Sequence, residues 1–314
     1  MANKGITKRI LAISPYIELL VRRLYWNKVK TVGGQRRKKK RVKNKIEKRV
    51  DFGEIISFLR QAGVQENSLA VVHSAYGPLK PIGKSPKEIV SSLLSLIGDG
   101  GTLAMPAMAK FKNDVPLSEY LDADITDIIF TYDVKKTPIK TGLLPIELAK
   151  REGAIRSRHP INTMLAVGPL AKELMRGNLD GASPLACGVN SSWKKCVDND
   201  AIIIGLGTDL THSLTMIHVA EDVLDKKWPV ANWYREKKFK IIDGELIENR
   251  VLRERHPRWG ALHFCERTLC RDLIRNGILK TKEFDGVLVE VARAKALIDF
   301  LNLKNKNAYP YFGV

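Results

Sequence analysis

The sequence contains few cysteines and no long apolar run. Its four cysteines, Cys187, Cys196, Cys265 and Cys270, form neither a C-x-x-C metal pair nor the dense array of a disulfide scaffold. No run approaches the roughly 18 apolar residues that a membrane-spanning helix requires, and the N-terminus lacks the pattern of a secretory signal. These absences disfavour the disulfide-rich secreted and integral membrane classes. They predict a cytoplasmic protein whose cysteines are ordinary buried thiols.

Positive charge is concentrated in the first 50 residues. The 314-residue chain has a formal charge of +19, and residues 1–50 hold 17 of its 53 Lys and Arg residues but only two acids, Glu18 and Glu47. The remaining chain is close to neutral, and with 44% hydrophobic residues the sequence is long enough to bury a sizeable core. We expect a basic arm over residues 1–50 and a globular domain over residues 51–314.

The arm combines an apolar segment with a basic cluster. Residues 10–26 are rich in Ile, Leu, Tyr and Trp, and the cluster that follows consists of Arg36 to Arg41, Lys43, Lys45, Lys48 and Arg49. This pattern predicts a basic helix that either lies on the inner face of a membrane or packs against the main domain or a second subunit. Zinc-finger and RNP-like motifs are absent, which disfavours nucleic acid as a partner.

After residue 50, helical and strand-like segments alternate. Residues 52–62 predict an amphipathic helix and residues 68–73 a buried strand. Ser85, Pro86 and Glu88 predict the capped start of a helix that ends at Ile97, before a strand over 102–106. Further strands are expected at 165–168 and 201–207, with a hairpin over 239–247 that turns at Asp-Gly and a closing strand and helix over 286–301. The order predicts a three-layer α/β/α domain with a largely parallel or mixed central sheet.

His218 and Glu221 are the most informative residue pair. They follow the apolar strand at 201–207, and their spacing of three residues places both side chains on one face of a helix. Open α/β sheets bind ligands beyond the carboxyl ends of their strands, so this is a suitable place for chemistry. Two other interpretations are an ordinary surface pair and two ligands of a zinc site. No third and fourth ligand follow at the spacing that zinc enzymes use, so we expect no metal.

Six short motifs in order resemble those of the aminoglycoside 3-N-acetyltransferases, especially relatives in sugar and surface-polysaccharide pathways. They are Val71 to Ser74 (V-V-H-S), Gly98 to Pro106 (G-D-G-G-T-L-A-M-P), Tyr132-Asp133 with Thr137-Pro138 and Gly142, Arg156 to Pro160 (R-S-R-H-P), Ser183-Pro184 and His218 to Glu221 (H-V-A-E). The resemblance implies a three-layer α/β fold. It also implies direct transfer of an acetyl group from acetyl-coenzyme A to an amino group of a sugar.

The resemblance also implies roles for individual residues. His218 is the expected general base, because an amine attacks a thioester only as its free base. Glu221 is expected to orient the imidazole, or instead to bind the incoming ammonium. Asp133 and Asp209 are the candidates for binding the acceptor amine. His159 could equally be a satisfied histidine in a rigid turn. The residues expected to line the coenzyme A site are His73, Ser74, Tyr76, Gly83, Lys84, Thr102, Met105, Pro106, Arg156, Ser157 and His159.

Departures from the family pattern concern the acceptor. Residues 214–217 read L-T-M-I where the antibiotic-acetylating members have N-T-S-L, and the domain is not strongly acidic, although a polycationic drug calls for an acidic cleft. We therefore predict an N-acetyltransferase acting on a nucleotide- or lipid-linked amino sugar in surface-glycan biosynthesis. The alternatives are an aminoglycoside 3-N-acetyltransferase that confers antibiotic resistance and a non-catalytic, coenzyme A-binding partner in glycan assembly.

Overall fold

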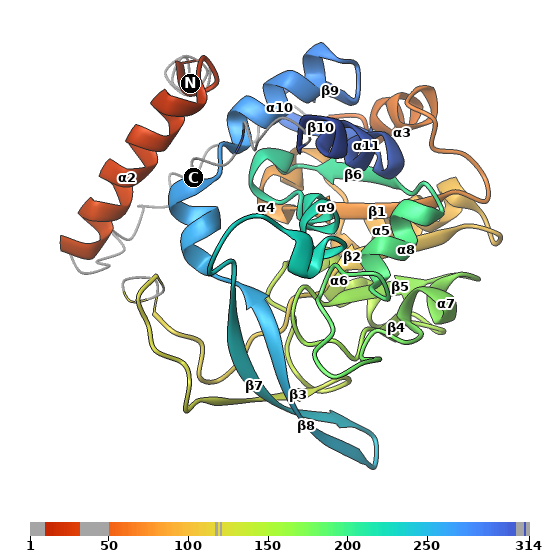
Figure 1. Cartoon of the computed structure of the whole chain (residues 1–314). Coiled ribbons are helices and arrows are strands. Elements are labelled where there is room, and N and C mark those ends of the chain that lie inside the picture. Colours follow the sequence, from red (N-terminus) through yellow and green to blue (C-terminus); the bar gives the residue numbers. More distant parts are fainter. Residues whose placement is uncertain (1–9, 32–49, 117–118, 120, 306–310, 312–314) are drawn as a thin grey trace.

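A seven-stranded mixed sheet forms the centre of the molecule (Figure 1). The structure is a computed structural model that describes residues 10–31, 50–116, 119, 121–305 and 311. The strand order is β4-β5-β2-β1-β6-β10-β9, and only the three central strands β1, β2 and β6 run parallel. The outer strands pair antiparallel, so the sheet is mixed. Its strands are β1 (Leu69–Ser74), β2 (Thr102–Pro106), β4 (Ile155–Arg156), β5 (Met164–Val167), β6 (Ile202–Leu206), β9 (Leu279–Phe284) and β10 (Val287–Arg293).

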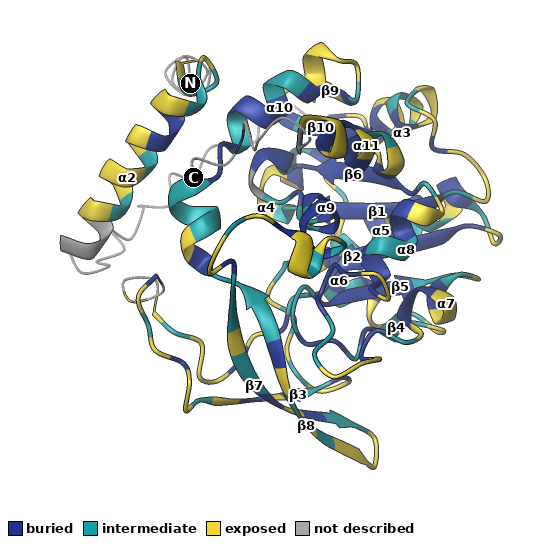
Figure 2. Ribbon diagram, in the orientation of Figure 1, coloured by how far each residue is buried: buried dark blue, intermediate teal, exposed yellow. Residues whose placement is uncertain are grey.

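Helices cover both faces of this sheet, as the three-layer prediction requires. In β1, Leu69 and Val71 enter one apolar core while Ala70 and Val72 enter the other, because successive side chains of a strand point to opposite faces. One core is closed by α3 (Phe52–Gln61), α5 (Pro86–Ile97) and α6 (Leu143–Leu148). The other is closed by α7 (Ala171–Met175), α8 (Ser192–Asp198), α9 (His218–Asp222), α10 (Glu266–Arg275) and α11 (Ala294–Asn305). Figure 2 shows the central strands buried between these layers.

The predicted strand, helix, strand unit forms as expected. Helix α5 begins with a complete capping box, in which the Ser85 hydroxyl accepts from the amide of Glu88 and the Glu88 carboxylate accepts from the amide of Ser85. The helix ends at Gly98, whose positive φ of 67° reverses the chain toward β2. Parallel pairing of Ala70 with Leu103 then completes the unit.

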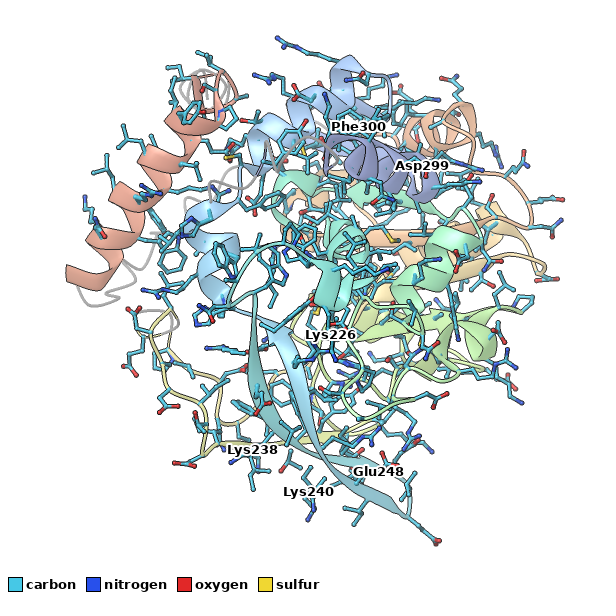
Figure 3. All side chains as sticks on the ribbon, viewed as in Figure 1. Lys226, Lys238, Lys240, Glu248, Asp299 and Phe300 are labelled. Atoms are coloured by element: carbon cyan, nitrogen blue, oxygen red, sulfur yellow. The ribbon has the colours of Figure 1, made fainter. Side chains whose placement is uncertain are left out.

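A second, three-stranded sheet lies beside the first. It consists of β3 (Ile129–Asp133), β7 (Tyr234–Asp243) and β8 (Leu246–Arg255), and Figure 3 shows Lys238, Lys240 and Glu248 on the β7–β8 hairpin. The hairpin is longer than the predicted 239–247, and Asp243 pairs with Leu246. The turn is therefore Gly244-Glu245 instead of Asp-Gly, with Gly244 supplying the positive φ of 64°. The added length carries Arg255 to the site described below.

The turn after β6 needs two glycines. A Cβ atom on Gly205 would lie 2.8 Å from Leu210, and one on Gly207 would lie 2.6 Å from Leu79. Gly207 also has a φ of 64°. This close packing makes Gly205-Leu-Gly207 a tight turn, and the chain continues from it through two short 3₁₀ turns into α9.

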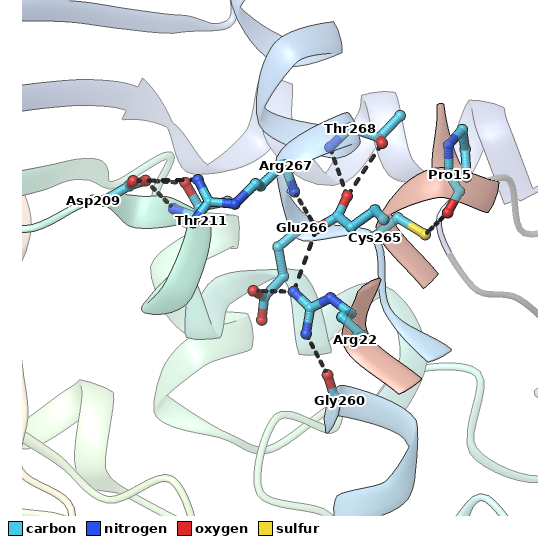
Figure 4. A network of polar contacts seen from close by, with 10 residues as sticks. Pro15, Arg22, Asp209, Thr211, Gly260, Cys265, Glu266, Arg267 and Thr268 are labelled. Atoms are coloured by element: carbon cyan, nitrogen blue, oxygen red, sulfur yellow. Dashed lines mark hydrogen bonds and ion pairs between the residues drawn. The ribbon is translucent and has the colours of Figure 1, made fainter. Parts of the chain in front are cut away.

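The N-terminal arm contains a helix, α2 (Pro15–Thr31), which packs against α10 (Figure 4). The Glu18 carboxylate accepts from the backbone amides of Arg267 and Thr268, at 3.1 Å each, and from the Thr268 hydroxyl at 3.2 Å. Glu18 thus supplies acceptors to the N-terminal amides of α10. Arg22 donates to the Gly260 carbonyl at 3.2 Å and to Glu266 at 2.5 Å. The packing alternative is therefore confirmed for this helix.

The predicted basic cluster from Arg36 to Arg49 lies outside the described residues. Within the described part of the chain, no helix has the length and apolar character needed to cross a membrane.

Replacing Glu18 with Ala should weaken the docking of α2. Glu18 is 2% exposed, so its removal leaves three donors of α10 without their acceptor. Burying unsatisfied donors costs about 1–3 kcal/mol, and we expect a loss of this size in the free energy of unfolding. Chemical denaturation measures it, with Glu245→Ala in the exposed hairpin turn as the control. Equal stability of the two variants would contradict the capping role.

Candidate active site

His218 and Glu221 form a hydrogen-bonded pair on α9. His218 Nδ1 lies 3.0 Å from Glu221 Oε2, as the spacing of three residues predicts. A carboxylate only accepts, so Nδ1 carries the proton and Nε2 keeps its lone pair. Glu221 is buried, and the imidazole borders two cavities. The pair therefore presents a basic nitrogen next to space for a ligand.

The surroundings keep this imidazole neutral. Burial is the main influence and lowers the pKa of His218, because a charged ring loses hydration there. The positive charge of Arg255 lowers it further, whereas Glu221 acts in the opposite direction. A base must reach the substrate unprotonated, so the net lowering suits proton acceptance near neutral pH.

The sequence pattern did not predict two side chains that lie next to the pair, Arg255 and Asp222. Arg255, at the end of β8, places Nη1 3.8 Å from Glu221 Oε1, and among the described residues this buried nitrogen has no hydrogen-bond partner. Asp222 accepts from the Tyr234 hydroxyl and from the amide of Cys187, at 2.9 Å each. Burial, followed by the charge of Glu221, raises the pKa of Asp222 to about 7. Arg255 pairs with Tyr234 at the end of the β7–β8 hairpin. A longer predicted hairpin would therefore have indicated where Arg255 lies.

Three cavities adjoin one another around His218. The largest, which we call the main cleft, has a volume of about 830 Å³. A small inner cavity of about 110 Å³ shares His218, Arg255 and Glu266 with it. A strand-end cavity of about 220 Å³ shares Ser213 and Thr215 with the inner cavity. His218 thus lines the main cleft and the inner cavity, and the inner cavity adjoins the strand-end cavity through Ser213 and Thr215.

The strand-end cavity contains three of the residues expected to bind coenzyme A. His73 and Ser74 at the end of β1 and Pro106 at the end of β2 line it. His73 is buried, its Nε2 has no hydrogen-bond partner in the described part of the chain, and burial lowers its pKa to about 4. A neutral imidazole with an unused nitrogen can bind a polar group of a ligand. These residues fit the cofactor that the resemblance implies.

The loop after Ser74 contributes differently from the prediction. The Tyr76 hydroxyl donates to the Lys84 carbonyl at 3.2 Å, and Gly83 closes the turn with a φ of 73°. Lys84 lies at a surface opening beside α3. None of these three residues borders the cavities around His218. They brace the turn that positions Ser74, and their expected contact with coenzyme A is not supported.

The side chains of the motif from Arg156 to His159 hold neighbouring chain segments together by hydrogen bonds. The Arg156 guanidinium donates to the carbonyls of Thr137 and Ala107, at 2.6 and 2.8 Å. The Ser157 hydroxyl donates to Asn178 at 2.8 Å. Both ring nitrogens of His159 are engaged, with the carbonyl of Pro184 and the backbone of Ile161. The rigid-turn interpretation of His159 therefore holds. The motif acts on the site indirectly. His159 holds the backbone of Ile161, and Ile161 lines the main cleft.

Thr102 and Met105 do not fit the predicted cofactor site. Thr102 begins β2, at the opposite end of the sheet, where its hydroxyl accepts from the amide of Leu170 at 3.0 Å. Met105 is fully buried in an apolar core. The motif that contains them builds the strand, and only its last residue, Pro106, reaches a cavity, because successive positions of a strand lie progressively further along the sheet.

The two predicted acceptor-binding acids also have local partners. Asp133 accepts from the amides of Lys135 and Lys136, at 2.9 and 2.8 Å, and lies outside the cavities around His218, so its expected role is not supported. Asp209 accepts from the amide of Thr211 and pairs with Arg267 at 4.0 Å (Figure 4). Arg267 lines the main cleft, so Asp209 acts on that cleft through a cation.

Helix α2 supplies one wall of the main cleft, which the sequence did not reveal. Its residues there are Leu11, just before the helix, and Glu18, Val21, Arg22, Tyr25 and Trp26. The opposite wall comes from α9, β8 and the start of α10. Four acids line the cleft, and each has a partner. Glu18 caps α10, Asp222 binds Tyr234, Glu254 pairs with Arg235 at 2.7 Å, and Glu266 pairs with Arg22.

Comparison with known proteins identifies relatives. The family model described as aminoglycoside 3-N-acetyltransferase matches residues 71–303. Aminoglycoside N(3)-acetyltransferase IX of Micromonospora chalcea is 26% identical over 241 residues, which cover 70% of this chain and 80% of the relative. Aminoglycoside N(3)-acetyltransferase III of a Salmonella species is 32% identical over 184 residues, which cover 55% of this chain and 62% of the relative.

A solved structure shares the fold. AAC-IIIb in a binary complex with CoASH superposes with a TM-score of 0.63 at 18% identity, over 82% of this chain and 97% of that chain. The mixed sheet with helices on both faces is thus the fold of an acetyltransferase in this group. Because the family model spans most of the chain, the protein belongs to the aminoglycoside 3-N-acetyltransferase family.

Proposed function

We propose that the protein transfers an acetyl group from acetyl-coenzyme A to an amino group of an aminoglycoside. The observation that carries this proposal is the His218–Glu221 pair beside a cleft of about 830 Å³. Family membership supports the aminoglycoside alternative better than the predicted role in surface-glycan biosynthesis. A cleft of this volume matches the size of typical small-molecule sites.

His218 acts as the general base. Acetyl-coenzyme A supplies an acetyl group activated as a thioester. His218 Nε2 accepts a proton from the attacking amine, while Glu221 holds the ring through Nδ1 and stabilises the imidazolium that forms. The strand-end cavity with His73 and Ser74 is our candidate for the thioester end of the cofactor, and the main cleft for the acceptor. The two substrates would then approach His218 from opposite sides.

A less cationic amino sugar, such as a nucleotide- or lipid-linked one, is a second candidate acceptor. The four acids that line the main cleft all have protein partners, whereas Arg255 Nη1, although 3.8 Å from Glu221 Oε1, makes no hydrogen bond within the described residues. A polycation would have to displace existing partners to reach these carboxylates, while a phosphate would find a donor in Arg255. This observation favours an acceptor that carries an anionic group.

Replacing His218 with Ala should reduce turnover about 10²- to 10⁴-fold, because it removes the base from the reaction. Thiol release from acetyl-coenzyme A measures the rate with a panel of aminoglycosides and nucleotide-linked amino sugars, and calorimetry measures coenzyme A binding. Binding should persist in the variant. Turnover on nucleotide sugars alone would favour the second acceptor. Absence of turnover with every acceptor would instead support the non-catalytic alternative.

Glu221→Gln and Arg255→Gln should shift the pH profile in opposite directions. The Glu221 charge raises the pKa of His218 and the Arg255 charge lowers it. Loss of the carboxylate should therefore move the acid limb of kcat/KM to lower pH, and loss of the guanidinium should move it to higher pH. Both profiles are recorded with one acceptor, so that its own amine titration is common to them. Shifts in the same direction would refute His218 as the titrating base.

A further inference from the structure

Helix α2 carries exposed residues along its length (Figure 2), and several of them are large and apolar. An apolar stripe, which we call the outer stripe, consists of Tyr16, Ile17, Leu20 and Leu24. Leu20 and Leu24 are 60% and 61% exposed. Each helical residue advances by about 100° around the axis, so these positions share one face, opposite the Glu18 and Arg22 side that contacts α10.

The outer stripe is not needed to hold α2 in place. The helix is anchored by polar contacts of Glu18 and Arg22 and by Arg271, which donates to the carbonyls of Ala12 and Ile13. A surface helix of a globular protein normally turns its apolar face toward the core. In α2, Leu19 is buried, but the outer stripe stays exposed on the other face, and a contiguous apolar surface of this kind marks an interaction site.

Basic side chains flank the outer stripe. Arg23 and Lys28 are exposed, and the helical rotation places them on either side of the stripe. The surrounding sequence has the same sign, since residues 1–50 hold 17 Lys and Arg residues and two acids. Long basic side chains beside an apolar stripe are typical of helices that lie in a membrane interface, where their charged ends meet lipid headgroups.

A second copy of the chain fits this surface poorly. A symmetric contact would place the same stripe of each copy against the other, and would bring two strongly basic arms together. An anionic bilayer instead neutralises that charge while it accepts the apolar side chains. We propose that the outer stripe of α2 docks the protein on an anionic membrane surface. This inference does not rest on the proposed acetyl transfer.

The test uses the full chain with vesicles of phosphatidylcholine, with or without phosphatidylglycerol. We expect cosedimentation with the anionic vesicles and little with the neutral ones. The double substitution Leu20→Glu/Leu24→Glu should reduce the partition constant by at least about tenfold, because it removes two apolar side chains and adds charge that the lipid repels. The matched control is Ile247→Glu/Leu303→Glu, which changes two other exposed apolar residues, 55% and 62% exposed, and should leave binding unchanged.

Three outcomes would overturn the proposal. They are no binding of the wild-type chain to anionic vesicles, equal loss of binding in both double variants, and a solution dimer that Leu20→Glu/Leu24→Glu dissociates without any lipid effect. Thermal unfolding reports whether each variant is folded, and Tyr16→Glu, at a position 83% exposed, provides a second variant if the first is not. Neither Leu20 nor Leu24 lines the main cleft, so the folded Leu20→Glu/Leu24→Glu variant should release thiol at the same rate as the wild-type chain.

Discussion

The candidate site depends on the burial of the Glu221 carboxylate. A buried carboxylate is costly unless charge and hydrogen bonds compensate it, and here His218 Nδ1 and the more distant Arg255 guanidinium provide that compensation. The first partner comes from the same helix and the second from the end of a long hairpin. The hairpin therefore has an electrostatic function at the site as well as a structural one. Without it, the carboxylate would depend on an imidazole whose own burial favours the neutral form.

Buried charges at the main cleft are compensated in the same way. Glu18 of α2 is compensated by the amides at the start of α10, and Arg22 connects α2 to Glu266. These contacts place an N-terminal helix in the wall of the cleft that His218 also lines, where the proposed acceptor would meet it. One side of α2 thus shapes the cleft, while the other presents the outer stripe. If both proposals hold, one short helix connects the acceptor site with the surface on which the protein lies.

Family membership and cleft chemistry bear on different questions. The family model covers residues 71–303, which include most of the sheet and the His218–Glu221 pair, and so accounts for the fold. In the proposed acetyl transfer the main cleft takes the acceptor, and Arg22 and Arg255 line that cleft outside the six motifs. The acids of the cleft are paired within the protein, which distinguishes it from an open acidic pocket for a polycation. Under this proposal the choice of acceptor depends on these cleft residues.

The sequence by itself determined the local features. The Ser85 capping box, the strand at β1 and the pairing of His218 with Glu221 depend on neighbouring residues, and each formed as expected. The tertiary structure alone decided which distant groups meet. It placed Arg255 beside Glu221 and Glu18 at α10, and it placed Thr102 at the far end of its strand from Pro106. Side-chain periodicity follows from backbone geometry, whereas contacts across hundreds of residues follow from how whole elements pack.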